Sequence, residues 1–197
     1  MKEKKGITGP LVVFACVALV LIVGVVFALQ WMRGFFTWSD MHHKYGDLFY
    51  GISDGVAIVY DVDANFSGEL VIPETLDGHP VYAISNYAFQ GTPGLTAVTV
   101  PDTVQIIGSH AFRNCRNLKR VTVGAFVRLI EDQAFYGCTS LEQICFRGKA
   151  PQLQSQVFGL EPGTKGTPVT VVLPPDSTTY TDEFWAGWDR SYIQMAP

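Results

Sequence analysis

The chain has 197 residues, of which 48% are hydrophobic and 16% are charged, and its formal net charge is −4. Residues 33–197 carry 11 Lys and Arg against 17 Asp and Glu. An acidic chain of this kind is a poor match for the phosphate backbone of a nucleic acid, so we expect no nucleic-acid partner. The length is sufficient for one hydrophobic core, and a second sizeable domain is not expected.

An apolar stretch over residues 11–32 contains no charged side chain. At a rise of about 1.5 Å per residue, it is long enough to cross the roughly 30 Å hydrocarbon core of a bilayer as one helix. Three lysines precede it, so the positive-inside bias places residues 1–10 in the cytoplasm and the rest of the chain outside the cell. We predict a single-pass anchor in the cell membrane. The small residues of Val26-Phe27-Ala28 are also compatible with cleavage and release.

A repeat of 23 residues dominates the rest of the chain. The pair Ala-Phe recurs at 88–89, 111–112 and 134–135, and Val-Phe follows at 157–158. One unit buries about seven apolar side chains, worth ~1.5–3 kcal/mol each. Ordering the residues of one unit costs on the order of 35 kcal/mol, so a single unit cannot fold alone. Stacked units share their inner faces and their strand hydrogen bonds, and the repeat therefore predicts a solenoid.

The spacing inside one unit predicts how the chain runs around each coil. In Leu-x-x-Val-x-Val, alternate residues lie on one side of an extended segment, so Val98 and Val100 point inward. Pro101 ends that strand because proline has no N–H to donate to a ladder. Val104-x-x-Ile107 and Ala111-Phe112 then return the chain along the other sides of the coil.

Two consecutive stretches, LTAVTVPDTVQIIGSHAFRNCRNLKRVTV and LKRVTVGAFVRLIEDQAFYGCTSLEQICF, resemble the BspA-type leucine-rich repeat of bacterial and protist surface proteins. YGISDGVAIVYDVDANFSGELVIPETLDGHPVYAI resembles the opening coil of that family, and YTDEFWAGWDRSYI resembles its aromatic closing segment. Gly108 keeps a glycine of the family pattern, whereas Ser85 and Glu131 replace it in the neighbouring coils.

These observations predict an α+β or mostly β solenoid of about five coils with a 23-residue period, preceded by one transmembrane helix. Gly24-x-x-x-Ala28 is a weak helix-pairing motif and predicts a weak homodimer through that helix. The expected segments are a cytoplasmic N-terminus (1–10), a transmembrane helix (11–32), a juxtamembrane stalk (33–48), the leucine-rich-repeat solenoid (49–174) and an aromatic C-terminal cap (175–197).

The residues that could carry chemistry do not form a catalytic or metal-binding pattern. Asp61-x-Asp63-x-Asn65 begins like a calcium loop, but Phe66 and Ile72 stand where an EF-hand needs glycine and glutamate. No histidine has a Cys or a second carboxylate at metal-ligand spacing. The sequence also lacks a P-loop, Gly-x-Ser-x-Gly and His-Glu-x-x-His. We therefore predict no metal, no cofactor and no enzymatic activity.

Three cysteines follow the apolar stretch. Cys115 and Cys138 occupy the same repeat position, and stacking at about 4.8 Å brings their Cα atoms within disulfide range. Parallel side-chain directions in stacked coils argue against that bond, and the family resemblance implies a small buried residue at this position. Cys145 lies mid-strand and points away from the core, which predicts a free thiol.

Two surfaces are candidates for partner binding. The first, the strand ladder, consists of the outward positions of successive strands: Glu69, Val71, Ala97, Thr99, Arg120, Thr122, Gln143, Cys145, Thr170 and Val172. The second, the basic corner, consists of Arg113, Arg116, Lys119 and Arg120. The basic corner is interpreted either as a solvated turn or as an anchor for an acidic partner or polysaccharide.

We expect a surface-displayed module for non-catalytic recognition or adhesion, whose partner is an unidentified extracellular protein or polysaccharide. A structural accessory subunit, docked permanently on another envelope or membrane protein, is the alternative. The mixed, threonine-rich ladder favours reversible binding over permanent docking.

Overall fold

The computed structural model describes residues 43–160, 168–175, 177–181, 184 and 193–195. The predicted transmembrane helix and the start of the predicted stalk lie outside these residues. Within them, no helix is long and apolar enough to cross a membrane. Every element with described bounds is a strand, and Phe184 is the one described residue in a helical conformation, so this part of the fold is mostly β rather than α+β.

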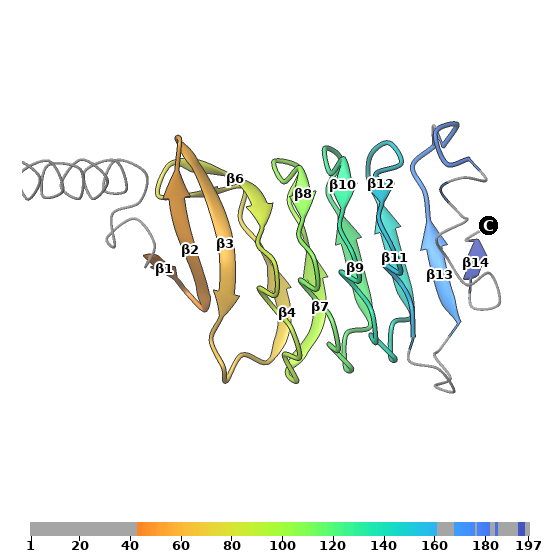
Figure 1. The fold of residues 1–197 in the computed structure, drawn as a ribbon, viewed down its shortest axis with the longest axis horizontal. Coiled ribbons are helices and arrows are strands. Elements are labelled where there is room, and N and C mark those ends of the chain that lie inside the picture. The colour runs from red at the N-terminus through yellow and green to blue at the C-terminus, as the bar shows by residue number, and fades with distance from the viewer. Residues whose placement is uncertain (1–42, 161–167, 176, 182–183, 185–192, 196–197) are drawn as a thin grey trace, which may run out of the picture. The chain divides into compact units, whose positions relative to one another are not determined.

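The solenoid begins with a cap of antiparallel strands (Figure 1). Strands β1 (His43–Tyr45), β2 (Leu48–Ser53) and β3 (Val56–Val62) pair in sequence order. The turn from β2 to β3 is Asp54-Gly55, and both residues have positive φ, as a two-residue hairpin of this type requires. Strand β1 therefore lies within the segment that was expected to be a stalk.

A second Asp-Gly hairpin links the cap to the coils. Strands β5 (Thr75–Leu76) and β6 (His79–Ile84) are joined by Asp77-Gly78, both with positive φ. Strand β6 also pairs in parallel with β3. The strand pairing therefore changes from antiparallel in the cap to parallel in the coils at this hairpin.

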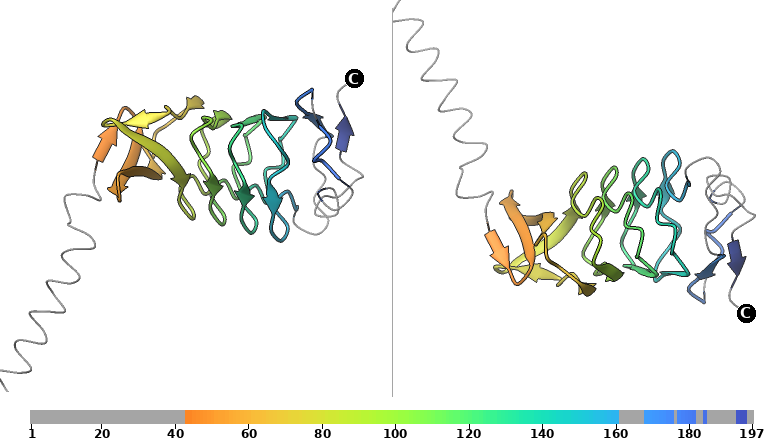
Figure 2. Two further views of the ribbon diagram at one scale, coloured as in Figure 1. Left: turned by 90° about the horizontal axis from the view of Figure 1, so that it is seen from above. Right: turned by 90° about the horizontal axis from the view of Figure 1, so that it is seen from below.

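Two sheets run along the solenoid on different sides of each coil (Figures 1 and 2). The first sheet continues from β6 through β8 (Ile106–Ile107), β10 (Leu129–Ile130) and β12 (Gln152–Leu153). The second sheet has the order β14-β13-β11-β9-β7-β4. Its strands are β4 (Gly68–Val71), β7 (Leu95–Thr99), β9 (Arg120–Val123), β11 (Gln143–Phe146), β13 (Val169–Val172) and β14 (Ile193–Met195). All of its pairs are parallel, as expected where successive coils repeat the same path.

Phenylalanine side chains fill the width of the coils. Phe89, Phe112, Phe135 and Phe158 stack in sequence, with ring centroids 5.0, 4.9 and 5.3 Å apart. The first three rings are fully buried, and the alanine before each of them is also buried, which lets neighbouring coils approach closely. The repeated Ala-Phe pair is thus the centre of the core, as its 23-residue spacing predicts.

Each coil turns from the first sheet to the second through the same corner. The residue three positions after the first-sheet strand adopts positive φ in four successive coils: Tyr87 (63°), His110 (60°), Gln133 (54°) and Gln156 (52°). The N–H groups of the first three donate to carbonyls of the next coil, at 3.0, 3.0 and 2.9 Å. We call these four residues the corner ridge. The inter-coil hydrogen bonds fix a backbone conformation that side chains other than glycine rarely adopt.

Candidate recognition surface

The strand ladder lies on the outward face of the second sheet. Its ten residues form two aligned columns, each passing from β4 through β7, β9 and β11 to β13. The first column is Glu69, Ala97, Arg120, Gln143 and Thr170, and the second is Val71, Thr99, Thr122, Cys145 and Val172. This is the register that the repeat predicts. The role of the ladder in partner binding stays a prediction.

Side chains of the ladder differ in exposure. Val71, on the first strand of the sheet, is 67% exposed, and the threonines of the second column are partly exposed. Ala97 is only 8% exposed, so it offers no contact surface, contrary to its inclusion in the ladder. Arg120 and Glu69, on the strands to either side, form an ion pair that spans the position of Ala97.

The four residues of the basic corner do not present four free charges. Arg113 donates from Nη1 to Oε1 of Gln133 at 2.7 Å, and its guanidinium lies 5.1 Å from the ring centroid of Tyr136. Lys119 lies 3.5 Å from a carboxylate oxygen of Glu142, and Arg120 pairs with Glu69. Arg116 is exposed. Two of the four charges, those of Lys119 and Arg120, are therefore balanced by carboxylates of other coils.

The two stacked cysteines are free and buried. Cys115 Sγ donates to the carbonyl of Phe89 at 2.9 Å, and Cys138 Sγ donates to that of Phe112 at 3.2 Å. Burial raises the pKa of the Cys115 thiol to about 12 and that of Cys138 well above its ordinary value. Both thiols thus stay protonated and pack as small core side chains, as the family resemblance implies. Cys145 is a free thiol with partial exposure.

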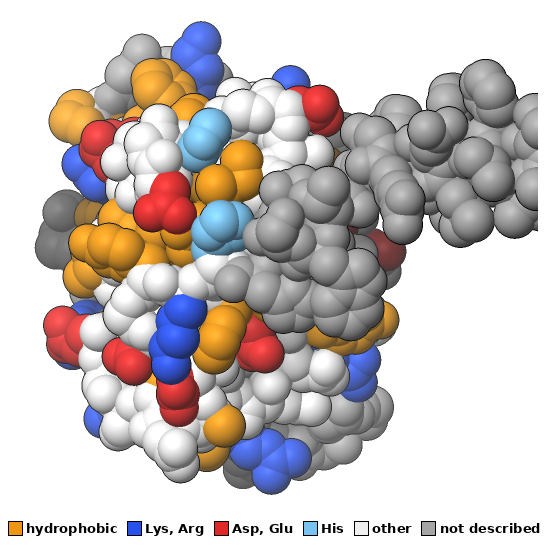
Figure 3. All heavy atoms as spheres, turned by 90° about the vertical axis from the view of Figure 1, so that its left-hand side faces the viewer, with side chains coloured by type: hydrophobic (Ala, Val, Ile, Leu, Met, Phe, Trp, Pro, Cys, Tyr) orange, Lys and Arg blue, Asp and Glu red, His pale blue; other side chains and the backbone are white. Residues whose placement is uncertain are grey.

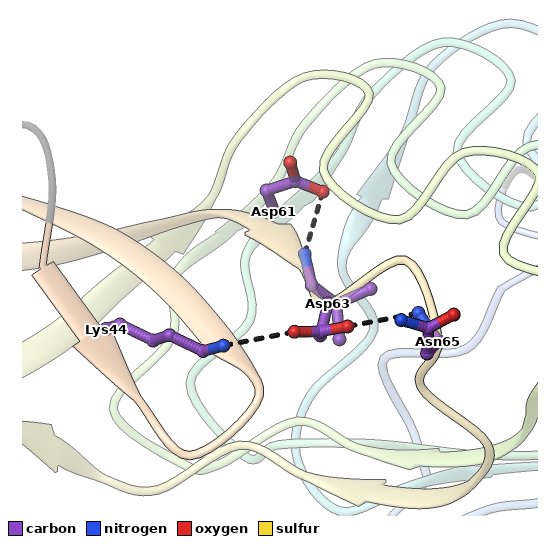
Figure 4. Close-up of polar contacts among 5 residues, drawn as sticks. Lys44, Asp61, Asp63 and Asn65 are labelled. Carbon is purple, nitrogen blue, oxygen red and sulfur yellow. Dashed lines mark hydrogen bonds and ion pairs between the residues drawn. The ribbon is translucent and has the colours of Figure 1, made fainter.

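The carboxylates that begin like a calcium loop are occupied by donors of the chain itself (Figure 4). Asp63 accepts from Lys44 Nζ at 3.0 Å and from the N–H of Asn65 at 3.1 Å, and these donors lower its pKa. Asp61 accepts from the N–H of Val62 at 2.8 Å. In the described part of the chain, no three His, Cys, Asp or Glu residues are grouped so as to hold a metal. The stretch is a polar turn held by these hydrogen bonds.

The side chain of Asp77 contacts two other residues of the cap. Asp77 accepts from the Tyr50 hydroxyl at 2.6 Å and lies 3.3 Å from Nδ1 of His43. Burial, together with this hydrogen bond, raises the pKa of Tyr50 to about 12. On the coloured part of the face in Figure 3, hydrophobic, acidic, basic and histidine side chains are intermingled, without a broad patch of one charge.

The 23-residue coils stack with parallel strands on two sides and with an aligned phenylalanine core. These features define a leucine-rich-repeat solenoid. More narrowly, residues 75–164 match the family model of the BspA type leucine rich repeat region, in six copies. Residues 75–164 are therefore a BspA-type leucine-rich-repeat region. No curated protein matches the chain.

Crystal structures of bacterial leucine-rich-repeat proteins share the fold. A Treponema pallidum leucine-rich-repeat protein is 28% identical with a TM-score of 0.56, over 70% of this chain and 63% of that one. A Bacteroides capillosus leucine-rich-repeat protein is 26% identical with a TM-score of 0.54, over 68% of this chain and 98% of that one. A leucine-rich cell surface protein of Faecalibacterium prausnitzii is 26% identical with a TM-score of 0.51, over 70% of this chain and 44% of that one.

Sequence reasoning missed the corner ridge. The signal was present, because the residue directly before each Ala-Phe or Val-Phe pair is Tyr87, His110, Gln133 or Gln156, all with planar polar side chains. What the sequence did not show is the positive φ at each of these positions, which in the first three coils accompanies an inter-coil hydrogen bond.

Proposed function

We propose that this chain is a membrane-anchored module, displayed on the cell surface, that recognises an extracellular protein or polysaccharide without catalysis. The observation that carries the proposal is the continuous parallel sheet with its aligned, partly exposed ladder. Solenoids commonly use such extended faces for binding, and leucine-rich-repeat solenoids are typically non-catalytic. The likeness to a leucine-rich cell surface protein supports display outside the cell.

The size of the ladder sets the expected strength of binding. Five strands about 4.8 Å apart and about five residues long offer on the order of 400 Å². A standard protein interface takes about 800 Å² from each partner, so the ladder alone supports weak binding. Many copies anchored by residues 11–32 in one membrane would raise the overall avidity without any new contact.

A photo-crosslinking amino acid tests the recognition surface in cells that display the full chain. Placed at Thr122, in the middle of the ladder, it is expected to give cross-links to an extracellular protein or polysaccharide. Placed at Gln152, an exposed residue of β12 in the other sheet, it serves as the matched control. Equal cross-linking from both positions, or none from Thr122, would contradict the proposal. Cross-linking of every copy to one envelope protein would instead support a permanent accessory subunit.

A further inference from the structure

We propose that the corner ridge is a second binding surface, and that it takes a neutral polysaccharide laid along the solenoid axis. This inference rests on the proposed recognition role, but it assigns the glycan to a different side of the coil from the strand ladder. The ridge follows the first-sheet strands β6, β8, β10 and β12, whereas the ladder lies on the second sheet.

The positive φ of the ridge positions does not explain which residue types occupy them. Among the described residues, every other residue with positive φ is Gly, Asn or Asp, the types that this conformation usually favours. Tyr87, Gln133 and Gln156 fall outside the favoured types, whereas His110 is of a type that is also enriched there, and Tyr87 is the bulkiest of the four ridge residues. A non-glycine residue held there carries a conformational cost, and such strain gathers at functional positions. Side chains that project from all four coils at such a cost point to a use outside the core.

An aromatic platform stands at the cap end of the ridge. The rings of Tyr87 and His110 stack with their centroids 4.8 Å apart and their planes 17° apart. Nδ1 of His110 is buried and has no hydrogen-bond partner among the described residues. The stack on Tyr87 is therefore a contact that helps to hold the imidazole ring in place. Tyr87 remains 56% exposed. An exposed aromatic face of this kind suits the apolar C–H face of a pyranose ring.

Carboxamides continue the ridge beyond the two rings. Gln133 donates from Nε2 to Oε1 of Gln156 at 3.1 Å and accepts from Arg113 at 2.7 Å. The contact of Arg113 with the Tyr136 ring holds the guanidinium in place. These bonds fix the amide planes before any ligand arrives, which reduces the entropy lost on binding. Each carboxamide carries donors and acceptors, the combination that sugar hydroxyls require.

The spacing and charge of the ridge favour a neutral chain of sugars. Successive coils are about 4.8 Å apart, close to the rise of one pyranose in an extended β-1,4-linked chain, so one coil can meet one sugar. Arg113 brings a guanidinium to the ridge through its bond to Gln133. The carboxylates of Glu131 and Asp132 lie in the same corner turns. Those carboxylates disfavour a polyanion.

Binding of cellohexaose and chitohexaose to the full chain in detergent micelles tests this inference by calorimetry. We expect at least one of these hexamers to bind. Tyr87→Asn removes the ring while keeping a residue suited to positive φ, and it is expected to weaken binding about tenfold. Tyr87→Trp keeps an aromatic ring at this position and is expected to bind as the unaltered chain does. Phe126→Ala is the matched control, because Phe126 is 69% exposed and lies at the opposite corner, between β9 and β10; its binding should equal that of the unaltered chain.

Lack of binding by the unaltered chain to both hexamers would overturn the inference, and so would equal affinity of the Tyr87→Asn variant. Thermal unfolding of each variant checks that the solenoid is intact. The Thr122 cross-linking experiment reads the strand ladder alone, so failure of the ridge and failure of the proposed recognition role give different results. A Tyr87→Asn variant that loses binding but keeps the Thr122 cross-links would support two separate surfaces.

Discussion

Glu69 and Arg120 form an ion pair across strand β7, above the position of Ala97. The two charged residues are 51 positions apart in the sequence but lie on β4 and β9, the strands to either side of Ala97. The pair closes part of the strand ladder and explains why a small outward residue is 8% exposed. If the ladder binds a ligand as proposed, contacts at this end would fall on Val71 and the threonines of the second column.

Removing the ion pair should change the surface more than the stability. Both partners are more than half exposed, and exposed pairs contribute roughly 0–1 kcal/mol, which salt screens further. Arg120→Ala is therefore expected to lower the free energy of unfolding by less than about 1 kcal/mol in low salt, and by less in 1 M salt. Urea unfolding of the single variants and of the Glu69→Ala/Arg120→Ala double variant measures the coupling. A coupling above about 2 kcal/mol would show that the pair is a core interaction.

Phe112 should be among the most costly side chains to truncate. It is fully buried and stacks on Phe89 and Phe135, so Phe112→Ala is expected to cost about 3–5 kcal/mol. Phe126→Ala, at a position that is 69% exposed, should stay within about 0.5 kcal/mol of the unaltered chain. Denaturant unfolding compares the two. Similar losses for both variants would mean that the phenylalanine stack is not the centre of the core.

Gly108 should tolerate no side chain. A Cβ at this position would lie 2.7 Å from the backbone nitrogen of Asn86 in the preceding coil, closer than real Cβ contacts come. Gly108→Ala is expected to cost about 1–3 kcal/mol, the usual range for overpacking. Ser109→Ala, at the next residue, is the control, since it removes only a partly exposed hydroxyl bonded to Glu131. A melting temperature for Gly108→Ala equal to that of the control would contradict the close approach of the two coils.

Cysteine reactivity should separate the three described thiols. In a Cys16→Ser background, a thiol reagent is expected to label Cys145 in the native chain and to label Cys115 and Cys138 only after unfolding. Burial raises the folded-state pKa of the latter two, so the native state holds their protons more tightly than the unfolded state does. Their contribution to stability is therefore complete below the unfolded thiol pKa, roughly 8.5, and declines as the pH rises above it. Labelling of three thiols in the native chain at pH 7, counted by mass spectrometry, would contradict this burial.

The solenoid could be predicted because its determinants are local and repeated. A 23-residue period fixes which residues stack, so the inward positions and the two columns of the ladder follow from Leu95, Val98 and their equivalents. The burial of Ala97 could not be predicted, because the ion pair that spans it joins residues two coils apart. The strands of the cap were also missed, although Asp54-Gly55 and Asp77-Gly78 are hairpin signals in the sequence.

The candidate site was less accessible to sequence reasoning than the fold. A basic cluster in the sequence indicates charge, but it does not show that Arg113 reaches Gln133 or that Lys119 reaches Glu142 in the next coil. The corner ridge depends in the same way on the stacking of coils, since positive φ at Tyr87 arises with a hydrogen bond to the carbonyl of Ser109.

Surface display of the repeat domain is tested most directly by protease shaving of intact cells that express the full chain. Protease is added outside, and the membrane fraction is then probed for residues 1–10 and for the repeat domain. We expect the repeat domain to be cut away while residues 1–10 stay protected with the membrane. Survival of the repeat domain until the cells are lysed would contradict display outside the cell, and partners would then have to be sought in the cytoplasm.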